Sequence, residues 1–140
     1  MELREWLNRG YGIYKRLIVK KAHMESIGNV ISNYELKETE GSSFENSSEI
    51  NVIRWSELKK EVDELKIKLF KIDKETEEVI SLLKNPDEYA VLYCRYVSRL
   101  SWADMVLALK FSKDYLYKLH RDGVNNLDAT TCYKVWDDET

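Results

Sequence analysis

Apolar and charged positions alternate most regularly in the middle of the chain. From residue 55 to residue 83 one set of positions recurs at steps of three and four, and charged residues fill the positions between. Its members are Trp55, Leu58, Val62, Leu65, Leu69, Ile72, Thr76, Val79 and Leu83. Such spacing places a narrow stripe on one side of an α-helix, as in a coiled coil. The pattern predicts one long helix over residues 52–84.

A less regular repeat with a period near seven begins at the N-terminus. It passes through Leu3, Leu7, Gly10, Tyr14, Leu17, Lys21, Met24, Gly28 and Ile31. A glycine inside a helix costs about 1 kcal/mol relative to alanine, so this helix is secure only from Ile13 onward unless the glycines serve the close approach of another helix. Residues 35–51 are rich in Glu, Ser, Asn and Gly and predict a flexible loop. The two repeats therefore predict a long antiparallel hairpin over residues 1–84, or alternatively pairing with a second copy of the chain.

A new set of helices is expected after residue 84. Asn85 and Pro86 are typical of a helix start, and that helix should reach about Val97. Ser101 can cap a second helix, and Ser112 a third. The inward residues would be Trp102, Met105, Val106 and Leu109 in the second helix, and Leu116 and Leu119 in the third. Two short helices joined by a tight turn are typical of a helix-turn-helix, although helical hairpins that do not read DNA are commoner.

The outward face of the last helix carries the candidate DNA contacts. They are Lys113, Tyr117, Lys118 and Arg121, with Arg99 and Lys110 as candidate phosphate contacts. Arginine and lysine donate to guanine edges or phosphates, and tyrosine can contact the backbone or a thymine methyl. Asp114 lies on the same face and opposes phosphate binding unless it accepts from a cytosine amine.

The C-terminal third of the chain resembles a known family. The run LYCRYVSRLSWADMVLALKFSKDYLYKLH is similar to the C-terminal half of the ArpU-type late transcription regulators of phages and prophages of Gram-positive bacteria. The matching positions are Leu92, Arg95, Tyr96, Ser101, Trp102, Met105, Leu109, Ser112, Leu116, Tyr117, Leu119 and His120. The resemblance extends more weakly over most of the chain. It implies a helix-turn-helix like that of region four of bacterial sigma factors, and binding to DNA.

Three positions depart from the pattern of that family. Where the two helices approach, the family has a small residue and this chain has Val106. At the turn, the family usually has Gly and this chain has Lys110. A left-handed backbone at Lys110 would cost on the order of 1 kcal/mol. The small residue late in the last helix is Gly123, which should weaken or end that helix.

Composition narrows the range of functions. The chain has 140 residues, 34% of them charged, with a net charge of −3. A general nucleic-acid binder is expected to be basic, so binding driven by overall charge is not predicted. Cys94 and Cys132 are expected to be reduced thiols, and no run of apolar residues predicts a membrane span or a secretion signal. We therefore expect a protein of the bacterial cytoplasm.

Catalytic chemistry is not predicted. His23 and His120 lie far apart in the sequence, and no zinc spacing, phosphate loop or nucleophile motif is found. The expectation is an all-α protein without metal, cofactor or enzymatic activity.

The sequence supports two functional hypotheses on one domain plan. That plan is a hairpin at 1–84 containing the loop 35–51, a helix-turn-helix domain at 85–127, and a tail at 128–140 whose Tyr133, Val135 and Trp136 pack back or cover a partner. The first hypothesis is a transcriptional regulator of phage or prophage type that reads DNA. The second is a protein-binding module on the same scaffold that engages RNA polymerase or a host protein, for example as a phage-encoded inhibitor.

Overall fold

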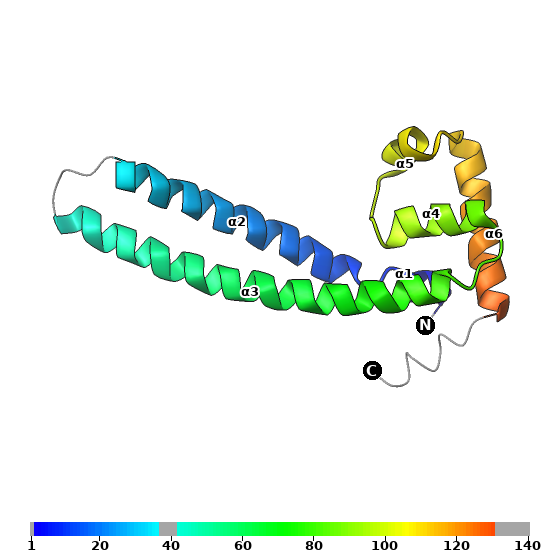
Figure 1. Cartoon of the computed structure of the whole chain (residues 1–140), viewed down its shortest axis with the longest axis horizontal. Coiled ribbons are helices and arrows are strands. Elements are labelled where there is room, and N and C mark those ends of the chain that lie inside the picture. Colours follow the sequence, from blue (N-terminus) through cyan, green and yellow to red (C-terminus); the bar gives the residue numbers. More distant parts are fainter. Residues whose placement is uncertain (1, 37–41, 131–140) are drawn as a thin grey trace. The chain divides into compact units, whose positions relative to one another are not determined.

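The computed structural model describes residues 2–36 and 42–130, and these residues form helices and connecting turns without strands (Figure 1). The helices are α1 (Leu3–Leu7), α2 (Tyr11–Leu36), α3 (Ser42–Ile80), α4 (Pro86–Tyr96), α5 (Trp102–Leu109) and α6 (Lys113–Thr130). The predicted all-α fold, a long helical hairpin followed by a small helix-turn-helix, is confirmed. The chain divides into two compact units, which we call the hairpin (residues 11–70) and the head (the described parts of residues 1–10 and 71–140).

In the hairpin, α2 and the first part of α3 lie side by side and run in opposite directions (Figure 1). The buried residues of this unit, among those described, are Leu58, Val62 and Leu69, all on α3. The facing residues of α2, such as Leu17 and Met24, are only half-buried. Two helices therefore cover each other along one seam and leave their other faces to solvent.

The seam of α2 differs in detail from the predicted repeat. Lys21, placed on the seam by the period of seven, is exposed, and Lys20 is the residue that bonds to the Glu61 carboxylate of α3. A helix turns by 3.6 residues, so a strict seven-residue count drifts around a straight helix. A Cβ added at Gly28 would lie 3.4 Å from Trp55 Nε1, which is ordinary van der Waals contact, so Trp55 of α3 packs over α2 at this glycine.

The ends of the predicted hairpin elements also shift. The N-terminal repeat is interrupted at residues 8–10, which separates α1 from α2. The loop predicted at 35–51 is shorter, because α2 continues to Leu36 and α3 already begins at Ser42. Extending an existing helix through Glu, Ser and Asn costs little per residue compared with starting one. At its other end α3 stops at Ile80 rather than at residue 84.

The head contains two hydrophobic clusters. The first joins α1 and the end of α3 to α4 and α6, and its buried residues are Leu3, Trp6, Leu7, Val79, Ile80, Leu92, Tyr96, Val124 and Leu127. The second joins α4, α5 and α6 around Val91, Met105, Leu116 and Leu119. The compact unit thus includes α1 and the last turns of α3, which the predicted division at residues 84 and 85 assigned to the hairpin.

The helices of the head begin where capping residues were predicted. Asn85 Oδ1 accepts from the Asp87 N–H at 2.9 Å, Ser101 Oγ from the Asp104 N–H at 3.1 Å, and Ser112 Oγ from the Tyr115 N–H at 3.2 Å. Each cap satisfies a donor that the first helical turn leaves free.

Two departures from the family pattern have different outcomes. Lys110, which ends α5, adopts the left-handed conformation with φ 59°, as anticipated for a glycine position. Gly123 was predicted to weaken or end the last helix. It does not end the helix, since α6 continues to Thr130. A Cβ at Gly123 would lie 3.3 Å from a methyl carbon of Leu92, so the missing side chain lets α4 approach α6 closely.

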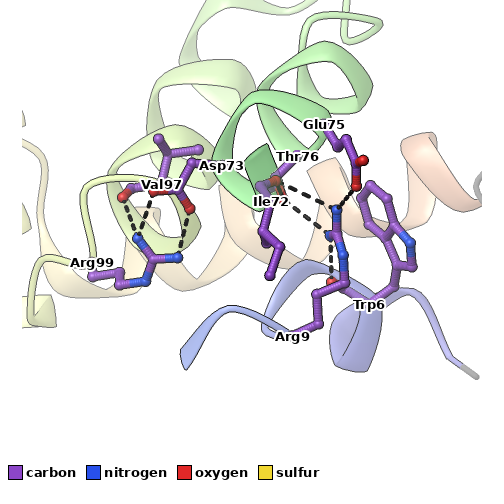
Figure 2. Close-up of polar contacts among 8 residues, drawn as sticks. All are labelled: Trp6, Arg9, Ile72, Asp73, Glu75, Thr76, Val97 and Arg99. Carbon is purple, nitrogen blue, oxygen red and sulfur yellow. Dashed lines mark hydrogen bonds and ion pairs between the residues drawn. The ribbon is translucent and has the colours of Figure 1, made fainter. Parts of the chain in front are cut away.

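Two arginines attach the end of α3 to the rest of the head (Figure 2). Arg9, in the turn after α1, donates to Glu75 Oε2 at 2.9 Å and to Thr76 Oγ1 at 3.0 Å. Its guanidinium carbon lies 3.8 Å from the ring centroid of Trp6. Arg99 donates to both carboxylate oxygens of Asp73, at 2.6 and 3.2 Å. These contacts explain why the last turns of α3 belong to the head.

Candidate nucleic-acid interface

The candidate interface is the outer face of α5, the turn and α6. On the inner side Met105 and Leu116 are fully buried and Leu119 is 4% exposed, while Trp102 and Leu109 pack partly buried against them. A helix with one side fixed in this way presents its opposite side to solvent. The shared interior assumed for these helices is therefore present.

The predicted contact residues of α6 lie on this outer side. Tyr117 is 43% exposed, the Arg121 side chain is 64% exposed, and Lys113 and Lys118 are exposed as well. Lys110 is exposed in the turn just before them. On a helix with 3.6 residues per turn, Tyr117, Lys118 and Arg121 share one stripe opposite Leu116 and Leu119.

Arg99 is placed apart from this group. Its side chain is 9% exposed, and its guanidinium is held by the Asp73 carboxylate and the Val97 carbonyl. Arg99 also has a left-handed backbone, with φ 57°, in the segment between α4 and α5. These contacts hold the largely buried guanidinium against Asp73, so we leave Arg99 out of the proposed DNA face.

An aromatic group supports Tyr117 from within the head. The Trp102 ring meets the rings of Tyr117 and His120 edge-on, with centroids 4.8 and 5.4 Å apart. The Arg95 guanidinium lies over Trp102, 4.9 Å from its centroid, and donates to the Leu100 carbonyl at 3.1 Å. Because Trp102 is held on both sides, it restricts the position of the Tyr117 side chain on the surface.

His120 forms the inner end of this group. Its Nε2 lies 2.7 Å from the Tyr96 hydroxyl. Burial, together with the positive charges of Arg4 and Arg95, lowers the pKa of His120 to about 4. The ring is therefore neutral at pH 7, and the tautomer of the ring sets the direction of its hydrogen bond with the Tyr96 hydroxyl.

The sequence did not point to Arg4 as part of this region. The positive charges of Arg4 and Arg95 contribute to the lowered pKa of His120. Arg4 is exposed on α1, and α1 packs against α6 through the first hydrophobic cluster. More than a hundred residues separate Arg4 from α6, so no spacing rule could have found this proximity.

Acidic residues balance the cations of the interface. Residues 102–130 contain four cations and four carboxylates, Asp104, Asp114, Asp122 and Asp128. Asp114 is exposed on the stripe, and the Arg121 Nε lies 3.6 Å from an oxygen of Asp122. A surface with so little net charge attracts a phosphate backbone weakly, so selective contacts would have to contribute more of the affinity.

Two other features, a metal site and a membrane span, are absent from the described residues. Within residues 2–36 and 42–130, no group of three or more His, Cys, Asp or Glu side chains is arranged to hold a metal ion. None of the helices in the described part has the length and apolar character that crossing a membrane requires. Comparison of the chain with known protein families, with curated proteins and with solved structures gives no match.

Proposed function

We propose that the protein is a DNA-binding transcriptional regulator of the kind that phages and prophages carry. The observation that supports this proposal is the exposed stripe of Tyr117, Lys118 and Arg121 on the second helix of a capped helix-turn-helix. In proteins of that class the second helix enters the major groove and its outward side chains reach the base edges. The resemblance of the C-terminal third to ArpU-type regulators points the same way.

The roles of the residues follow from their positions. Arg121 and Lys118 donate to guanine edges or phosphates, and Tyr117, held by Trp102, contacts the backbone or a thymine methyl. Lys110 and Lys113, at the turn and the start of α6, contact phosphates.

Selection from a random duplex DNA library tests this function without knowledge of the operator. We expect enrichment of one short motif at moderate salt. The double variant Lys118→Ala/Arg121→Ala should bind that motif at least tenfold more weakly. The slope of log K against log salt should fall by roughly 0.9 for each lost phosphate contact.

The matched control removes two cations from the hairpin. Lys66 and Lys68 are exposed on α3, so Lys66→Ala/Lys68→Ala changes the net charge by the same amount. This control should bind the motif as the wild type does. Absence of any enriched motif, or equal losses in both variants, would rule out DNA reading by α6.

One observation favours the second candidate, a protein-binding module. Leu107 is 77% exposed at the centre of the outer face of α5, with the exposed Ala103 and Ala108 beside it. A small apolar surface next to balanced charges suits a protein partner such as RNA polymerase or a host protein. Here the head should retain a stoichiometric partner from nuclease-treated lysate, and Leu107→Asp should abolish retention while DNA binding is absent in the wild type.

A further inference from the structure

A cleft of about 410 Å³ opens between the segment that precedes α4 and the last turns of α6. No residue of the candidate DNA face lines it. Its walls include the apolar Leu82, Leu83 and Ala129, and the polar Glu88 and Asn126, with Lys84 also lining it. Small-molecule sites commonly combine a volume of this order with apolar walls and a few convergent polar groups.

Glu88 is the unusual residue of this cleft. It is 6% exposed, and among the described residues its carboxylate receives one side-chain hydrogen bond, from Asn126 Nδ2 to Oε1 at 2.7 Å. No buried side-chain nitrogen or oxygen in the described part lacks a partner. The second carboxylate oxygen therefore keeps some access, and Glu88 has that access through the cleft it lines.

The second carboxylate oxygen of Glu88 can accept a further hydrogen bond from a group that enters the cleft. A cation is the donor that suits a carboxylate best, since charge-assisted hydrogen bonds are the stronger ones. Lys84 lines the same cleft but forms no ion pair among the described residues. The apolar side is open as well, since Leu82 is 54% exposed.

We propose that this cleft binds an organic cation, an alkylammonium or guanidinium group carried on an apolar body. The cation donates to Glu88 beside Asn126, and the apolar body covers Leu82, Leu83 and Ala129. A free amine and a lysine or arginine side chain of a partner protein share this chemistry. The site is independent of DNA binding by α6.

Titration of the full chain with 2-phenylethylamine, followed by ¹H–¹⁵N NMR, tests the site. We expect saturable shifts at residues 82–85, Glu88 and Asn126, with a dissociation constant on the order of 1 mM for so small a ligand. 3-Phenylpropionate has the same ring and the opposite charge, and should shift these signals at least tenfold less. The peptide acetyl-Leu-Lys-Leu-amide distinguishes the two sources, because tighter binding of the peptide than of the amine indicates a protein side chain.

Variants separate the charge from the shape of the site. Glu88→Gln keeps an oxygen for Asn126 and should weaken amine binding at least tenfold, whereas Glu78→Gln, on the exposed face of α3, should not. Ala129→Phe fills the cleft from its exposed rim and should abolish binding with Glu88 intact, so a folding defect in one variant does not decide the result. Equal binding of amine and propionate, or unchanged binding by Glu88→Gln, would overturn the proposal.

Discussion

The hairpin and the head consist of the same secondary structure but bury their apolar side chains to different extents. In the head, Val91, Leu92, Met105 and Leu116 are 0% exposed, because each helix there packs against at least two others. In the hairpin, two long helices cover each other along one seam, and apolar residues such as Ile67, 71% exposed, remain in solvent. A regular heptad pattern therefore predicts a long helix reliably, while the depth of the core depends on how many neighbours that helix finds.

Their ion pairs differ in the same way. Arg99 and Asp73 in the head have side chains 9% and 24% exposed, and the guanidinium spans both carboxylate oxygens. Lys20 and Glu61 in the hairpin are 36% and 40% exposed. The Lys20 hydrogen bond lowers the pKa of Glu61, but water screens such a pair.

The largest difference in unfolding free energy between the two units is expected when one leucine in each is replaced by alanine. Leu116→Ala empties a site that is 0% exposed, and it should cost about 3 to 5 kcal/mol of unfolding free energy. Leu65→Ala, at a half-buried position of α3, should cost about 1 kcal/mol. Urea denaturation followed by circular dichroism measures both. Equal losses would show that the hairpin has a core as deep as that of the head.

Loss of one arginine should rank second. Arg99→Ala leaves the Asp73 carboxylate largely buried without its partner and should cost about 2 to 3 kcal/mol. Lys20→Ala should leave the unfolding free energy unchanged within error. The double variant Arg99→Ala/Asp73→Ala should be more stable than Arg99→Ala alone; a simple sum of the two single effects would contradict the coupling.

The pH dependence of stability should come from the head. The folded pKa of His120, about 4, lies below the ordinary 6.5, so the unfolded chain binds a proton first as the pH falls. Stability is therefore complete above pH 6.5 and falls toward pH 4, by on the order of 1 to 2 kcal/mol once partial solvent access is discounted. In the variant His120→Gln, the melting temperature should depend less on pH in this range. In His23→Gln, a change in the hairpin, it should depend on pH as in the wild type.

The smallest expected changes in unfolding free energy come from introducing one glycine in each unit, and they should have opposite signs. Lys110→Gly relieves a left-handed backbone, φ 59°, and should stabilise the protein by about 1 kcal/mol. Lys68→Gly places a glycine inside α3 and should destabilise it by about 1 kcal/mol. Thermal unfolding of both variants checks the signs. A loss of stability in Lys110→Gly would mean that the lysine side chain makes a contact worth more than the strain.

Much of the head was predictable because its signals are local. Asn85, Ser101 and Ser112 cap the helices that they were expected to cap, since a cap involves residues only two or three positions apart. The exposure of Tyr117, Lys118 and Arg121 followed from the helical period once Leu116 and Leu119 faced inward. The structure places the candidate contact residues of α6 on one surface.

Three details of the structure differ from what the sequence suggested. Arg99 was a candidate phosphate contact, and the structure pairs it with Asp73, 26 positions away. Gly123 was expected to weaken or end the last helix, but α6 continues to Thr130, and the missing side chain makes room for Leu92 of α4. The loop predicted at 35–51 is too long, because the composition of a segment does not indicate where the neighbouring helices end. The aromatic residues of the predicted tail, residues 133–136, lie outside the described residues.

By itself the sequence determined α4, α5 and the start of α6, the caps at which these helices begin, and the stripe on α6. These features depend on backbone conformation and on hydrogen bonds between near neighbours, which residue type and spacing control directly. Only the tertiary structure decided that Arg9 binds α3 at Thr76, 67 positions away, and that α1 packs against α6 in one hydrophobic cluster. Such contacts depend on which surfaces meet when apolar faces are buried, and spacing along the chain carries no information about that meeting.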